Sequence, residues 1–130
     1  NLGGTVILAE NPSIEVVIDL HRDGVADTTH LVTEINGKPT AQIMFFNGLS
    51  RAGKGDLVGM ANPYLQDNLA FSLQMKIAAE TKYPDLQGET ILRGYKYNMD
   101  LMPRMLLIEA GAQTNTVEEM RNAMGGVGSL

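Results

Sequence analysis

Two short apolar runs, each ending in polar residues, constrain the fold of this chain most. The first is VVIDLHRDG, Val16 to Gly24, and the second is MLLIEAG, Met105 to Gly111. Nearly continuous apolar character is typical of a strand covered on both faces, so we expect a central strand over 14–20 and a short buried strand over 105–108.

The polar residues at the ends of these two runs predict a shared site. Ligands of open α/β sheets gather outside the carboxyl ends of the strands. If the two strands run parallel, His21 and Glu109 therefore open into the same crevice.

The segments around these runs alternate between helix and strand signals. Asn36-Gly37 predicts a two-residue hairpin, because both residues tolerate positive φ. Thr116 to Glu119 matches a capping box and predicts the start of a last helix. The other expected elements are the end of a helix over 5–10, a helix from Asn62-Pro63 to Tyr83-Pro84 with an apolar stripe of Leu65, Leu69, Leu73 and Ile77, and a strand over 89–97.

Together these signals predict a single α/β domain over residues 1–130. We expect three layers, with a twisted sheet that is mostly parallel or mixed and helices on both of its faces.

Composition excludes several classes of function. The net charge is −5, the basic residues are scattered, and Trp is absent, which speaks against a nucleic-acid partner. The chain has no cysteine, so a metal site would have to use Asp, Glu or one of two histidines. No apolar run is long enough to span a bilayer.

A nucleotide site is also disfavoured. VVID resembles a Walker B strand, and the loop from Gly48 to Gly55 approaches a Walker A motif. That motif requires Ser or Thr after its lysine to coordinate magnesium, whereas Lys54 is followed by Gly55. The two motifs also occur in reversed order, so a surface loop is the better interpretation.

The strand-end residues are more consistent with metal-assisted hydrolysis. His21 could bind zinc, since imidazole is a common ligand and zinc lowers the pKa of bound water. Glu109 could act as general base, with its pKa raised by apolar neighbours. From the pattern alone His21 could equally be structural and Glu109 an ion-pair partner. Arg22 and Asp23 could orient substrate or His21, or pair with each other, and His30 is expected to face solvent.

Several stretches taken together resemble one family. They are DLHRDG, INGK with the following AQIMFFNG, GLSR, NPYLQDNLAFS, and YKYNMDLMPRMLLIEAGAQTNTVEEMRNAM. In order and wording they are similar to stage II sporulation protein P, a family of cell-wall hydrolases related to zinc-dependent N-acetylmuramoyl-L-alanine amidases. The resemblance covers Asn11 to Met124.

The resemblance implies a function and roles for two residues. His21 matches the later zinc histidine and Glu109 the catalytic glutamate. The implied substrate is peptidoglycan, cut between the lactyl group and L-alanine of the stem peptide, with cleavage of peptide cross-links also attributed to the family. The implied setting is engulfment during sporulation, outside the membrane and anchored to it in the full-length protein, alongside a stage II sporulation protein D-like lytic transglycosylase.

The chain departs from the family pattern in the zinc ligands. The family's first zinc histidine and its glutamate ligand lie upstream of DLHRDG, where this chain has twenty residues and no histidine. We therefore expect the chain to be the C-terminal part of an amidase-like catalytic domain, inactive alone. The alternative is a peptidoglycan-binding or scaffold domain that keeps the fold without catalysis.

Overall fold

The computed structural model describes residues 2–52, 55–56 and 61–130. Helices and strands alternate along the chain, which confirms the expected α/β class. The elements are α1 (Leu2–Glu10), β1 (Val17–Asp23), β2 (Val32–Ile35), β3 (Lys38–Ala41), β4 (Ile43–Gly48), β5 (Arg51–Ala52), β6 (Gly55–Asp56), α2 (Leu65–Lys82), β7 (Gln87–Arg93), the 3₁₀ turn η1 (Met99–Leu101), β8 (Met105–Ala112) and α3 (Val117–Gly128).

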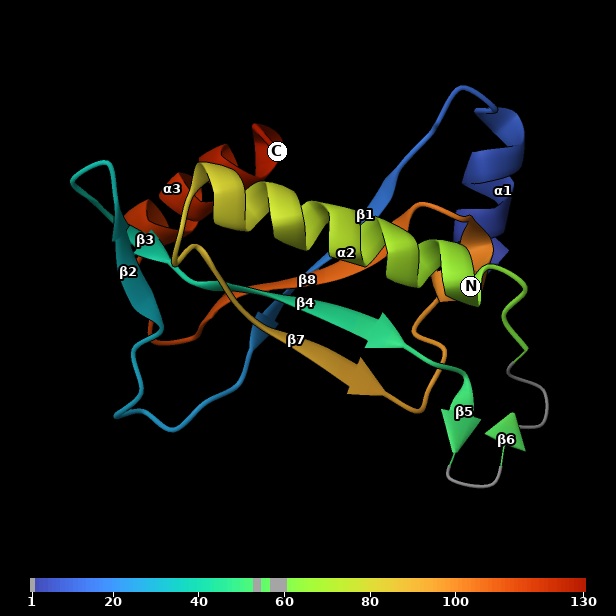
Figure 1. Cartoon of the computed structure of the whole chain (residues 1–130), viewed down its shortest axis with the longest axis horizontal. Coiled ribbons are helices and arrows are strands. Elements are labelled where there is room, and N and C mark those ends of the chain that lie inside the picture. The colour runs from blue at the N-terminus through green and yellow to red at the C-terminus, as the bar shows by residue number, and fades with distance from the viewer. Residues whose placement is uncertain (1, 53–54, 57–60) are drawn as a thin grey trace.

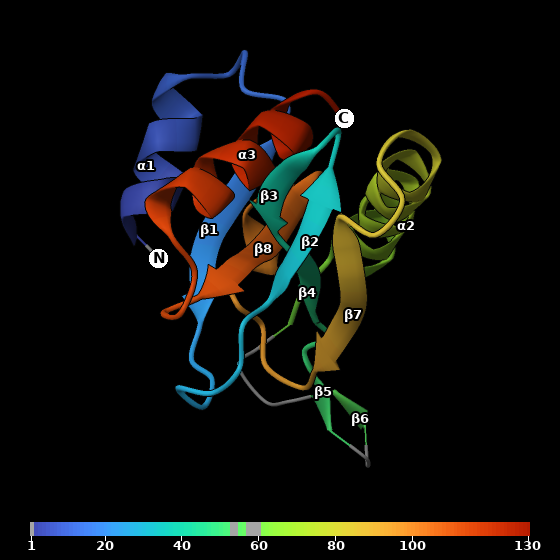
Figure 2. The same cartoon turned by 90° about the vertical axis from the view of Figure 1, so that its left-hand side faces the viewer.

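The main sheet has four strands in the order β1-β8-β4-β7 and is mixed (Figures 1 and 2). β1 runs parallel to β8, β8 runs antiparallel to β4, and β4 runs parallel to β7. The last strand of the chain therefore lies between the first strand and β4.

The two apolar runs occupy different places in the sheet. β8 is a central strand, and its residues 105–108 are all buried, as the sequence predicts. The prediction of a central, doubly covered β1 is wrong for the described chain. β1 is an edge strand in which Ile18 is 41% and Leu20 53% exposed, because α3 packs mainly against β3 and β8.

The Asn36-Gly37 hairpin forms as predicted. β2 and β3 pair antiparallel around it, and the two turn residues have φ of 52° and 76°. Positive φ at both central residues is the requirement of a type I′ turn. Pro39 lies in β3 beside the turn, and the hairpin forms a two-stranded sheet of its own against α3 (Figure 2).

Helix α2 packs by a face that differs from the predicted apolar stripe. Leu73 and Ile77 are 58% and 59% exposed. The buried face instead carries Asn68 and Ser72, whose side chains bond to the carbonyl oxygens of Met102 and Pro103 and to Asn47. Helical spacing therefore identified an apolar stripe, but polar side chains with specific partners occupy part of the interface.

Each face of the sheet has its own apolar cluster. Ile43, Phe45, Leu106 and Ile108 pack on one face beneath α2 and α3 (Figure 1). On the opposite face, Met105 and Leu107 pack with residues of η1 and of the loop before it.

The glycine-rich segment 48–59 is described only in part, and Gly48 is the last residue of β4. Its described part forms the small β5-β6 pair. Lys54, the lysine of the Walker-like motif, is outside the described residues. None of the described helices is long and apolar enough to cross a membrane.

Candidate active site

His21 and Glu109 lie side by side on adjacent parallel strands. The register of β1 and β8 pairs the two residues directly. Directly paired residues project from the same face of a sheet. The structure therefore confirms the predicted juxtaposition of the two strand ends.

Asp19 fixes the orientation of the His21 imidazole. Asp19 lies two residues earlier on β1, hence on the same face, and its Oδ1 is 2.9 Å from His21 Nε2. A proton on Nε2 would be donated to this carboxylate and would leave Nδ1 with a lone pair. The His21 side chain is 51% exposed, so that nitrogen can accept a proton or bind an ion.

The surroundings of Glu109 shift the pKa of its carboxyl group upward. Partial burial raises its pKa above the ordinary value, and the nearby Asp23 carboxylate raises it further. The positive fields of His21 and Arg93 act in the opposite direction without cancelling the rise. A raised pKa makes the ionised carboxylate a stronger proton acceptor, which favours general base catalysis.

Asp23 and Arg22 belong to different faces of β1. The β1-β8 register shifts between His21 and Asp23, and the Asp23 carboxylate accepts a hydrogen bond from Gly24 N at 2.7 Å. Arg22 faces the opposite side, where it lines a groove of about 450 Å³ with Leu20 and residues of α3. Among the described interactions no Arg22–Asp23 ion pair occurs, so Asp23 remains near Glu109 and Arg22 does not.

The described residues do not form a complete metal site. A catalytic zinc site takes three protein ligands. Over residues 2–52, 55–56 and 61–130, no three His, Asp or Glu side chains gather closely enough to hold a metal ion. The His21 imidazole, held by Asp19, suits one ligand position, since metal-binding histidines commonly donate their second nitrogen to a carboxylate.

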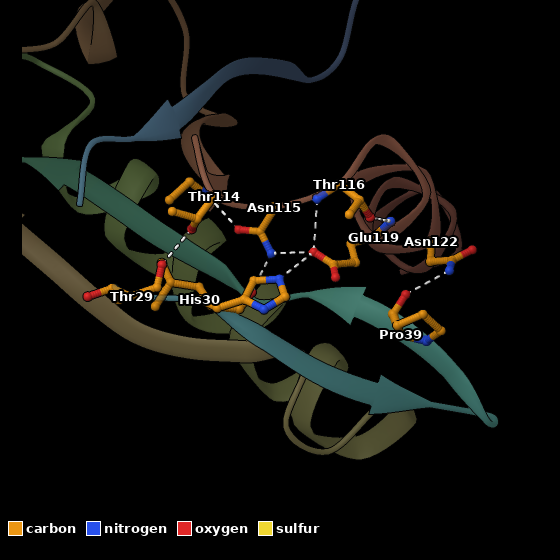
Figure 3. A network of polar contacts seen from close by, with 10 residues as sticks. Thr29, His30, Pro39, Thr114, Asn115, Thr116, Glu119 and Asn122 are labelled. Carbon is orange, nitrogen blue, oxygen red and sulfur yellow. Dashed lines mark hydrogen bonds and ion pairs between the residues drawn. The ribbon is translucent and has the colours of Figure 1, made fainter. Parts of the chain in front are cut away.

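A polar network joins the loops that follow the two site strands (Figure 3). Asn115 Nδ2 donates to Leu31 O at 2.9 Å and to Glu119 Oε2 at 2.8 Å, and Thr114 Oγ1 donates to Thr29 O at 2.5 Å. These contacts tie the loop after His21 to the turn after Glu109. They hold the ends of β1 and β8 in one arrangement.

The predicted solvent-facing histidine belongs to this network. His30 precedes β2 and is about half exposed, but its Nε2 lies 2.8 Å from the buried Glu119 carboxylate. Burial would raise the pKa of Glu119, yet hydrogen bonds from His30, Asn115 and Thr116 N outweigh it and hold the pKa below its usual range. The capping box signal located Glu119 correctly, but nothing in the sequence indicated its partner across the fold.

The fold and this arrangement define a class of protein, an α/β domain that presents a histidine and a glutamate on neighbouring parallel strands. Comparison with known sequences identifies the family. The chain belongs to the stage II sporulation protein P family, whose sequence profile matches residues 5–127. This confirms the resemblance that the motifs indicate.

One characterised relative shows the extent of the match. The chain is 31% identical over 123 residues to Stage II sporulation protein P of Bacillus subtilis (strain 168), which covers 89% of this chain and 27% of the relative. The chain thus spans about a quarter of that relative's length. No solved structure matches the chain.

Proposed function

We propose that this chain contributes the catalytic strand ends of a peptidoglycan hydrolase, an N-acetylmuramoyl-L-alanine amidase. The observation that supports this most is Glu109, a carboxylate with a raised pKa, directly paired with His21 on the adjacent strand. Membership of a sporulation family adds the biological setting. The substrate bond is the amide between the lactyl group and L-alanine of the stem peptide.

In this proposal Glu109 acts as the general base. Its carboxylate accepts a proton from the attacking water, whose oxygen bonds to the amide carbonyl carbon. The carbon–nitrogen bond then breaks, and Glu109 returns the proton to the departing amine nitrogen. Proton transfer of this kind contributes typically about 10²–10⁴-fold in rate.

His21 would hold its imidazole toward the same reaction centre through the contact with Asp19. If zinc is the cofactor, His21 supplies one ligand, and the remaining ligands are not among the described residues of this chain. Zinc when bound would polarise the carbonyl and acidify the water. Because the described ligand set is incomplete, the steps above rest on Glu109 alone.

The setting of the reaction follows from its substrate. Peptidoglycan lies outside the cytoplasmic membrane, so we propose an extracytoplasmic site of action, with a membrane anchor in the full-length protein, during engulfment. A lytic transglycosylase like stage II sporulation protein D would be the natural partner, since it cleaves the glycan strands. Cleavage of peptide cross-links is a second activity that the same site could perform.

The test compares variants of the full-length protein on purified sacculi. Wild type, His21→Ala, Glu109→Gln and the control Arg121→Gln, which lies on the other side of the sheet, are incubated with zinc or with a chelator. Mass spectrometry should detect stem peptides with new L-alanine amino termini from wild type and Arg121→Gln only. If wild type and all the variants bind sacculi and none of them cuts, the protein is a wall-binding or scaffold domain and the proposal is wrong.

A further inference from the structure

Arg93 lies on the same face of the sheet as His21 and Glu109. Glu109 pairs with Met44 on β4, and side chains alternate along a strand, so Phe46 shares that face. Phe46 in turn pairs with Ile91 on β7, which places Arg93, two residues further on, on the same face.

The Arg93 side chain extends over the neighbouring strand. Its guanidinium carbon is 6.0 Å from the centroid of the Phe46 ring. Phe46 is two residues from Met44, or about 7 Å along the strand. Phe46 also contacts Tyr97 edge to face, with the ring centroids 4.8 Å apart. An aromatic surface carrying one cation therefore begins roughly 10 Å from Glu109.

Unlike Lys76 and Lys96, Arg93 makes no close ion pair among the described residues, although its positive field reaches Glu109. Lys96 pairs with Asp100 at 3.0 Å and Lys76 with Glu80 at 2.9 Å. The contact of Arg93 Nη1 with the carbonyl oxygen of Leu92, at 3.3 Å, engages one N–H group. A guanidinium has five donors, so most of them face solvent.

We propose that Arg93 binds a carboxylate of the peptide substrate about three residues beyond the bond that is cut. This inference rests on the proposed function. An extended peptide covers about 3.3 Å per residue, so the roughly 10 Å between Glu109 and the aromatic surface beneath Arg93 corresponds to about three residues. The planar fork of arginine suits two parallel hydrogen bonds to a carboxylate.

The residues around Glu109 are acidic, so Arg93 is placed to select for an anionic peptide. Asp19, Asp23 and Glu109 make the β1 end of the face acidic, which would repel an anionic peptide. Arg93 supplies attraction at the far end of the face and thereby sets the direction in which the peptide lies. Its removal should weaken substrate binding.

Binding is measured first, in a Glu109→Gln background of the full-length protein that does not cut. The probes are two soluble muramyl peptides, identical except that the stem-peptide carboxylates are free in one and amidated in the other. Arg93→Gln should weaken binding of the free acid about tenfold or more and leave binding of the amide within about twofold, with Arg93→Lys between. Arg121→Gln is the control with the same charge change on the opposite side of the sheet.

Kinetics in the active protein complete the test. Arg93→Gln should raise KM for the free acid by a larger factor than it lowers kcat, as expected for an interaction made equally before and during reaction. Equal weakening of both peptides, or an effect no larger than that of Arg121→Gln, would show that Arg93 is only a surface residue stacked on Phe46. If wild type binds and cuts neither peptide, the proposed function itself is wrong, and Arg93 has no such role.

Discussion

The side chain of Asn115 bonds to the backbone of Leu31, 84 residues away in the sequence, with Nδ2 2.9 Å from the carbonyl oxygen. Its Oδ1 accepts from Ala112 N at 2.7 Å, and Nδ2 also donates to Glu119. One side chain thus joins the strand that carries Glu109, the loop that follows His21, and the first turn of α3.

Asn115→Ala should therefore destabilise the fold by about 2–3 kcal/mol, because it leaves partly buried backbone groups without partners. Urea unfolding followed by circular dichroism measures the change. Asn122→Ala, which removes one bond to Pro39 O, should cost about 1 kcal/mol or less. Equal costs for the two variants would contradict the central role of Asn115.

Glu119→Gln tests how the stability of the fold depends on pH in the acid range. The pKa of Glu119 is depressed in the folded state, so the stability it contributes is present above the unfolded pKa of about 4.3 and is lost as pH falls through the folded pKa. At pH 7 the variant should be less stable by about 1–3 kcal/mol, and the gap should close in acid. Glu118→Gln, one residue away, should show no such convergence.

Glu109→Gln should change the stability of the fold in the opposite direction. The pKa of Glu109 is raised in the folded state, so its ionisation opposes folding increasingly as pH rises through the folded pKa. Because the group is partly solvated, we expect a gain below about 1 kcal/mol at pH 7 and none near pH 4. Thermal unfolding at both pH values measures it, and a loss of stability at pH 7 would show that the carboxylate is stabilising.

Gly111→Ala should be strongly destabilising. Gly111 has φ of +54°, and a Cβ there would lie 2.5 Å from Asn115 Oδ1 and 3.0 Å from Ala41 Cβ. The expected cost is above about 2 kcal/mol. Gly125→Ala in α3 meets nothing within 4 Å and should be neutral or stabilising by up to about 1 kcal/mol. The denaturant midpoint should fall for Gly111→Ala and should stay the same or rise for Gly125→Ala.

Leu73→Ala should cost less than about 1 kcal/mol, because the side chain is mostly exposed on α2. The same change at the fully buried Leu106 should cost about 2–5 kcal/mol. A large cost at Leu73, measured by the same unfolding titration, would show that the predicted apolar stripe is covered after all.

The sequence was informative where one residue type sets the local backbone. The Asn36-Gly37 turn, the Thr116 capping box and the buried run of β8 all form as predicted. The His21–Glu109 pair could also be predicted, because it depends only on two apolar strands running parallel.

The remaining features depend on which elements become neighbours. Arg93 reaches the site face because β7 lies beside β4 and β4 beside β8, an order that no local pattern contains. His30 and Glu119 meet across 89 residues. The exposure of Leu20 likewise follows from the place of β1 at the edge of the sheet, whereas its apolar pattern indicated the centre.

The position of β8 between β1 and β4 also sets the order in which the sheet can assemble. During synthesis β1 and β4 emerge early, yet both must wait for residues 105–112 before either gains its β8 partner. Contacts of such long sequence separation slow folding. The pairing that brings His21 beside Glu109 is therefore among the last to form, and exposed apolar strands must stay apart from other chains until then.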